Sequence, residues 1–149
     1  MKQTNLLLLL AVISFLRPVV AQGCDLTLIP INFGAYNMLS GFPLDTTGSI
    51  EVNCAVSGIA YRVILGPGKD SAGSLRKMRD SEGIDTLTYN LYTDAARTII
   101  WGDGTVGTVT QSAVSSQIVR RFNIHGRIGA GQNVKPGLYS DQVIVTVEW

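Results

Sequence analysis

The last stretch of the chain, residues 139–149, reads YSDQVIVTVEW and decides the fold more clearly than any other segment. Its larger side chains share one face, at Tyr139, Val143, Val145, Val147 and Trp149. Ile144, Thr146 and Glu148 occupy the other face. An alternation with a period of two is typical of a half-buried β-strand. The sequence therefore predicts that the chain ends in a strand with one apolar face.

The same pattern recurs toward the N-terminus, with turn residues between the repeats. Alternating or short apolar runs occupy residues 26–31, 50–54, 61–65, 87–93, 99–101 and 119–124. Glycine, proline, asparagine and aspartate separate these runs, as expected between strands. Only Ser74 to Glu82 could form a turn of helix, and its apolar face is too small for more. Seven or eight short strands predict an all-β antiparallel sandwich or barrel.

The first 21 residues have the pattern of a secretory signal peptide. Lys2 precedes an apolar run from Leu6 to Leu16, and small residues lead to a cleavage site after Ala21. The run is shorter than the roughly 20 residues that a transmembrane helix needs. We therefore expect residues 1–21 to be removed and residues 22–149 to form one exported domain, in the periplasm and then at the cell surface.

An exported chain with two cysteines favours a disulfide, here between Cys24 and Cys54. The alternative is a lipid-modified Cys24, because Gly23 precedes it near the end of the signal peptide. Gln22 is a poor residue at the preceding position, and lipidation would leave Cys54 unpaired. The sequence favours the disulfide.

Charge and residue content argue against nucleic-acid binding and against enzyme chemistry. Removal of Lys2 and Arg17 leaves ten basic residues against eleven acidic ones, without the basic stripe that recruits phosphates. His125 is the single histidine, too few for a zinc site, and its position on the polar side of a strand end predicts a surface residue. Asp103 lies between glycines, which is typical of a turn rather than a calcium loop. We expect no catalytic residues, no cofactor, no metal and no small-molecule substrate.

Aromatic residues offer one possible ligand surface. Tyr89 and Tyr139 fall on predicted core faces, whereas Tyr92 and Trp101 could be exposed and could stack on a sugar. Core packing or cross-strand pairing is the commoner use of such residues. A self-contained secreted carbohydrate-binding module is therefore a second hypothesis for function.

Several motifs together resemble a known family. They are Asn32-Phe33-Gly34, Ile50-Glu51-Val52-Asn53-Cys54, Leu87-Thr88-Tyr89-Asn90-Leu91-Tyr92-Thr93-Asp94, Trp101-Gly102-Asp103-Gly104, His125-Gly126-Arg127-Ile128, Ala130-Gly131-Gln132 and the stretch from Gly137 to Val147. This set resembles the spore coat protein U family, which includes the pilins of archaic, Csu-type chaperone–usher pili. The family often has Tyr and Pro where this chain has His125 and Gly129, which concerns local turn geometry.

The resemblance implies an immunoglobulin-like sandwich that lacks its final strand. A periplasmic pilus chaperone would first lend a strand, and a neighbouring pilin subunit would replace it by donor-strand complementation during assembly at an outer-membrane usher. The groove for that strand would lie beside the last strand, with Val143, Val145, Val147 and Trp149 on its apolar side. The implied function is a subunit of a secreted pilus, or fimbrium, in cell adhesion and biofilm formation. A spore or surface coat protein is the alternative that the family name suggests.

One departure concerns the ability to donate a strand. Cleavage after Ala21 leaves Gln22 and Gly23 before Cys24, whereas an ordinary strand needs about 5–6 residues. We therefore expect a subunit that accepts a strand without donating one, at the tip or end of a fibre. Recognised tip adhesins of the family have two domains, and this sequence predicts one.

Overall fold

The computed structural model describes residues 23–105, 107–116 and 118–149. The predicted signal peptide lies outside this range. The described residues form nine strands: β1 (Cys24–Ile29), β2 (Leu44–Cys54), β3 (Ala60–Leu65), β4 (Arg76–Asp80), β5 (Thr86–Tyr92), β6 (Gln111–Val114), β7 (Arg120–Ile128), β8 (Tyr139–Ser140) and β9 (Val145–Glu148). In this part of the chain no helix is long and apolar enough to cross a membrane.

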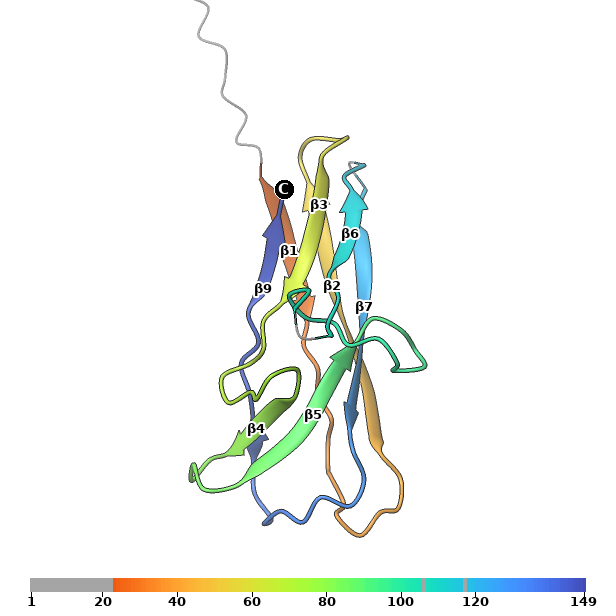
Figure 1. Ribbon diagram of the computed structural model, residues 1–149. Helices are drawn as coiled ribbons and strands as arrows, with labels where there is room; N and C mark the ends of the chain where they lie inside the picture. The colour runs from red at the N-terminus through yellow and green to blue at the C-terminus, as the bar shows by residue number, and fades with distance from the viewer. Residues whose placement is uncertain (1–22, 106, 117) are drawn as a thin grey trace, which may run out of the picture.

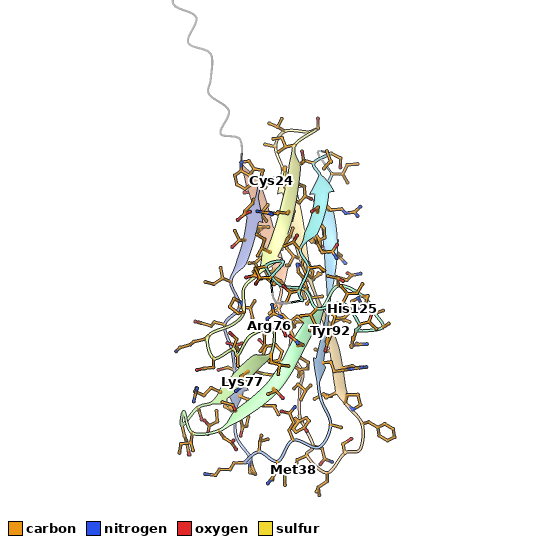
Figure 2. The ribbon with its side chains drawn as sticks, in the orientation of Figure 1. Cys24, Met38, Arg76, Lys77, Tyr92 and His125 are labelled. Atoms are coloured by element: carbon orange, nitrogen blue, oxygen red, sulfur yellow. A yellow bond between two sulfur atoms is a disulfide. The ribbon has the colours of Figure 1, made fainter. Side chains whose placement is uncertain are left out.

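The strands form two antiparallel sheets that pack as an immunoglobulin-like sandwich (Figure 1). The larger sheet has the order β1-β2-β7-β5-β4-β8, and the smaller has the order β6-β3-β9. The molecule is elongated, with Cys24 at one end and Met38 at the other (Figure 2). We call these the Cys24 end and the Met38 end. The C-terminus lies at the Cys24 end (Figure 1). The predicted all-β fold is confirmed.

The longest pairing, between β2 and β7, follows directly from the alternation in sequence. Ile50 is opposite Phe122 on the core side, and Glu51 is opposite Arg121 on the outer side, where they form an ion pair. Residues directly opposite each other in an antiparallel pair project to the same face. A slip of one residue would place the charged pair in the core, so the register is strongly determined.

Trp101 lies in the core and is completely buried. Its ring centroid lies 6.1 Å from that of Phe122, and Phe122 in turn lies 6.3 Å from Tyr61. The Trp101 indole Nε1 donates a hydrogen bond of 3.1 Å to the Val63 backbone oxygen. This bond joins the loop after β5 to the smaller sheet, so the two sheets are closed over each other here.

Residues 74–82 do not form the turn of helix that the sequence allowed. They contain β4, which pairs with β5 and with β8. Arg76 explains the difference, because its guanidinium is buried near the centre of the molecule (Figure 2). It donates five hydrogen bonds of 2.8–3.4 Å, to the backbone oxygens of Leu65, Gly66 and Trp101 and to the side chain of Asn90. Burial lowers the pKa of Arg76, and these acceptors replace the water that the guanidinium lost. Tertiary contacts therefore set the conformation of this segment.

The last stretch also differs from the single strand predicted for it. Tyr139 and Ser140 form β8 in the larger sheet, whereas Val145–Glu148 form β9 in the smaller one. Residues 141–144 cross from one sheet to the other. The chain therefore divides one alternating pattern between the two layers of the sandwich.

Candidate functional site

The inward face of β1 is exposed although its pairing places it on the core side. Leu28 is directly opposite Ile50, and Leu26 is directly opposite Val52. Ile50 is 0% exposed, but Leu28 is 52% exposed. The two side chains project to the same face of the sheet, so the difference arises in the layer above them. That layer covers Ile50 and leaves Leu28 open.

The uncovered region is a groove of about 1280 Å³ that runs along the sandwich. One wall is formed by residues 28–38, from the end of β1 onward, and the other by residues 134–145, which lead into β9. Its lining also includes Leu65, Met78, Leu87, Tyr89, Leu91, Ile124 and Ile128. We call this hollow the β1–β9 groove.

Both walls of the groove carry sheet edges. β1 lies at one edge of the larger sheet and β9 at one edge of the smaller sheet. An edge strand presents backbone N–H and C=O groups that can pair with a further strand. The groove therefore offers apolar contacts along its floor and backbone hydrogen-bonding groups along its sides.

Asp141 fixes the wall that leads into β9. The Tyr89 hydroxyl donates a hydrogen bond of 2.8 Å to its Oδ2, and the Lys69 backbone N–H donates one of 2.9 Å to its Oδ1. Burial, reinforced by the neighbouring Asp141 carboxylate, raises the pKa of the Tyr89 phenol. Tyr89 therefore remains a proton donor at physiological pH. These bonds hold the crossing segment in place where it leaves the larger sheet.

Tyr36 fixes the opposite wall near the Met38 end. Its hydroxyl donates to the Gly129 backbone oxygen at 3.1 Å and accepts from the Gln132 N–H at 2.8 Å. The Gln132 side chain continues this connection to β5, because its Nε2 donates to the Thr88 oxygen at 2.8 Å. Both walls are thus tied to the framework, and the groove is formed without any partner.

The disulfide joins Cys24 to Cys54 at the start of β1. The two residues are also register partners, so the bond fixes β1 to β2 at the Cys24 end. This anchoring holds β1 in the sheet although the groove side of the strand is uncovered. The predicted disulfide is confirmed.

The four residues predicted for the groove lie in three different surroundings. Val143 and Val145 line the groove. Val147 is partly buried against the core. Trp149 is 61% exposed and lines a separate hollow of about 600 Å³ beside Val114. The shared face predicted from the alternation therefore ends before Trp149.

The sequence reasoning missed the opposite wall of the groove. Leu28, at the start of that wall, is predicted as a strand residue and not as part of a site. Alternation gives the face that its side chain occupies, and it does not show whether that face is covered. Residues 30–38 form no strand, so periodicity could not identify them either.

The predicted ligand surface of Tyr92 and Trp101 is wrong in one of its two members. Trp101 is completely buried and cannot present its ring to a sugar. Tyr92 is half-buried and is directly opposite His125 on the larger sheet (Figure 2).

His125 lies within β7, and not at the strand end predicted from the sequence. The Asp103 carboxylate accepts a 2.9 Å hydrogen bond from the Thr105 N–H, as expected of a turn.

Comparisons with known proteins agree with this fold. Residues 10–146 match the family model described as the Spore Coat Protein U domain. Protein U of Myxococcus xanthus is 36% identical over 128 residues, which cover 78% of this chain and 70% of that protein.

Solved structures of pilus proteins are also similar. One is a chain of the CsuC–CsuE chaperone–tip adhesion subunit pre-assembly complex from the archaic chaperone–usher Csu pili of Acinetobacter baumannii, with a TM-score of 0.64 and 23% identity. The match covers 87% of this chain and 40% of that chain. Another is HdaB, the E. coli Hda pilus minor tip subunit, with a TM-score of 0.45 and 15% identity over 83% of this chain and 79% of that one.

Proposed function

Since this chain belongs to the Spore Coat Protein U domain family, we propose that it is a structural subunit of a secreted surface pilus, acting in adhesion and biofilm formation. The observation that carries this proposal is the exposure of Leu28 opposite a fully buried Ile50. A self-contained domain would cover both residues. A subunit that receives a strand from a partner leaves one of them open until that partner binds.

The β1–β9 groove has the chemistry that strand addition requires. Backbone groups of an edge strand supply affinity, and alternate side chains of the incoming strand enter apolar pockets. Val143 and Val145 form one wall of these pockets, with Leu28 on the other. Apolar surface left in water forfeits about 25 cal/mol per Å², so occupation of the groove is strongly favourable. The expected occupants are a strand of a periplasmic chaperone, followed during assembly at an outer-membrane usher by a strand of a neighbouring subunit.

We place this subunit at the tip or end of the fibre. With cleavage after Ala21, two residues precede Cys24, which already belongs to β1 and is bonded to Cys54. These two residues are too few to fill the groove of a neighbour. The subunit would accept a strand and donate none. This chain spans about 40% of the tip-subunit chain that it resembles, so its role in a fibre must be tested on this protein itself.

A coat protein that assembles without a fibre is the second candidate. The family name, Spore Coat Protein U domain, favours it. The two candidates differ in their need for a helper. A pilus subunit with an open groove requires a chaperone before assembly, whereas a coat protein of this kind would be stable and soluble alone.

The test is periplasmic expression with and without a candidate periplasmic pilus chaperone, followed by affinity pull-down and gel filtration. We expect a soluble one-to-one complex with the chaperone, and aggregation or proteolysis without it. Replacement of Val145 by Asp, in the groove wall, should abolish the complex. Leu75→Asp is the matched control, because Leu75 is an exposed apolar residue outside the groove. A stable monomer that ignores the chaperone would contradict the proposal.

A further inference from the structure

A second hollow lies on the outer face of the smaller sheet, toward the Cys24 end. It measures about 600 Å³, which is within the size range of small-molecule sites. β3 lies between β6 and β9 (Figure 1), and the hollow extends over these three strands. We call it the outer hollow. The described residues that line it are all different from those that line the β1–β9 groove.

Two small side chains, Ala60 and Ser112, form the floor of the outer hollow. Ala60 is the register partner of Val114, and Arg62 is the register partner of Ser112. Alternation places these four side chains on the outer face, because Tyr61, between Ala60 and Arg62, is buried. Ala60 and Ser112 fill little space, so the larger side chains around them form walls.

Apolar side chains stand on both sides of this floor. Trp149 directly follows β9 and is 61% exposed, and Val114 in β6 is 60% exposed. These strands flank β3 on opposite sides, and neighbouring strands are about 4.8 Å apart, so the backbones that carry the two walls are separated by roughly 10 Å. The Trp149 indole therefore presents a flat apolar face to a ligand of small-molecule size.

An ion pair forms the polar wall of the outer hollow. Arg62 and Glu148 are register partners on the outer face of the sheet. Arg62 Nε donates to Glu148 Oε2 at 2.8 Å, and Arg62 Nη2 contacts the same oxygen at 2.6 Å. Within the described part of the chain, Arg62 Nη1 and Glu148 Oε1 have no partner. One donor and one acceptor of the pair are therefore open to a ligand.

The chemistry of these walls favours an uncharged, hydroxylated ring. The charges of Arg62 and Glu148 cancel, and an anionic ligand would have to compete with Glu148 for Arg62. A sugar ring has C–H groups on its faces, and the hydroxyls at its edge both donate and accept hydrogen bonds. We propose that the outer hollow binds one ring of a neutral oligosaccharide. The ring stacks on Trp149, and its adjacent hydroxyls hydrogen-bond to Arg62 and Glu148.

This site is separate from the one proposed for strand addition. Val63 and Val147 project toward the interior, whereas their sequence neighbours Arg62 and Glu148 project outward, with side chains 57% and 47% exposed. A strand in the β1–β9 groove packs against the inner side chains. The outer hollow can therefore be tested without regard to the outcome for the groove.

Tryptophan fluorescence gives a direct readout, because the chain has two tryptophans in opposite surroundings. Trp101 is completely buried, so acrylamide should quench the fluorescence of the exposed Trp149 selectively. The exported protein, purified alone if it is soluble and otherwise as sheared fibres, is screened on an array of neutral and acidic oligosaccharides. We expect it to bind a neutral oligosaccharide. The same compound should protect Trp149 from acrylamide, measured as the difference from the Trp149→Phe variant.

Three variants and a matched control test the assignment of the walls and the floor. Trp149→Ala should weaken binding about tenfold or more, and Trp149→Phe, which keeps a flat ring, should recover part of the loss. Ala60→Ile fills the floor with a residue suited to a strand, and should abolish binding although every contacting group remains. Phe42→Ala is the control, because Phe42 is an exposed aromatic residue on the loop between β1 and β2, outside the outer hollow. It should bind within about twofold of the unchanged protein.

Several outcomes would overturn the assignment. They are the absence of binding to every neutral oligosaccharide on the array, binding limited to acidic oligosaccharides, and binding that survives both Trp149→Ala and Ala60→Ile. Protection of Trp149 on concentration of the protein without sugar would identify a second copy of the chain as the occupant, and would overturn it as well. None of these outcomes bears on the β1–β9 groove.

Discussion

The core around Trp101 and the β1–β9 groove are built from the same alternating pattern, but the core is covered and the groove is open. Around Trp101, both sheets contribute side chains and the core is closed, with Phe122 and Tyr61 in edge contact. Along the β1–β9 groove, Leu28 has the core-facing register and is 52% exposed. The difference shows that alternation determines which face a side chain occupies, whereas coverage depends on what the other layer supplies.

The largest expected effect on the free energy of unfolding comes from filling the β1–β9 groove. A strand of about ten residues with alternating valines, joined after Trp149 by a short Gly/Ser linker, can fold back into the groove. Each valine that it buries contributes about 1.5–2 kcal/mol, so we expect the free energy of unfolding to rise by about 5 kcal/mol or more. Urea denaturation measures the change. The same extension with serine in place of valine is the control, and equal stability of the two would show that the groove does not accept a strand.

Alanine variants at two register partners, Ile50 and Leu28, compare the covered core with the open groove directly. Ile50→Ala should cost about 2–5 kcal/mol, because Ile50 is fully buried. Leu28→Ala, at the register partner, should cost less than about 1 kcal/mol in the free chain, because half of its side chain is already in water. In the chain with the filled groove the cost of Leu28→Ala should rise to about 2 kcal/mol. Similar costs for the two variants in the free chain would mean that β1 is already covered.

Loss of the disulfide should lower the stability of the whole domain and loosen β1 first. Cys24→Ser with Cys54→Ser removes a link between residues 30 positions apart, which is worth about 3–4 kcal/mol in the chain-entropy model. Because β1 pairs only with β2 among the described strands, we expect hydrogen exchange to accelerate in β1 before it does in β5 or β7. Uniform acceleration throughout the sheets would contradict this view of β1.

The smallest expected effect concerns acid stability on the outer face of the larger sheet. The hydrogen bonds from Arg127, and the nearby charges of Arg97 and Arg127, hold the pKa of Asp45 below its usual value. The folded state binds this proton less readily than the unfolded state, so the contribution is present above about pH 4 and is lost as the pH falls through the lowered pKa. Asp45 is 33% exposed and screened by solvent, so we expect Asp45→Asn to cost less than about 1 kcal/mol at neutral pH. Urea denaturation of both proteins should show this difference disappearing toward pH 2, and a difference that grows with acidification would contradict the assignment.

Sequence reasoning succeeded where local alternation and tertiary packing agree. The predicted run at residues 61–65 is contained in β3, and most of the run at residues 87–93 is β5. It failed at β4, because arginine is usually a surface residue and Arg76 is buried through acceptors on other strands and loops, among them Gly66, Asn90 and Trp101. It did not identify β6, where polar residues outnumber apolar ones at Gln111 to Ala113. Half of the candidate groove could be predicted, since Val143 and Val145 belong to a clear alternating run, whereas Leu28 could not be.

The sequence by itself determined the fold class, the disulfide pair and the family to which the chain belongs. These features depend on local periodicity, on the number of cysteines and on motifs made of consecutive residues. Only the tertiary structure decided that the last stretch is divided between two sheets, that Trp101 is inside, and that Leu28 faces an empty space. Burial is a property of what lies across the sandwich, and that layer comes from residues far away in the chain.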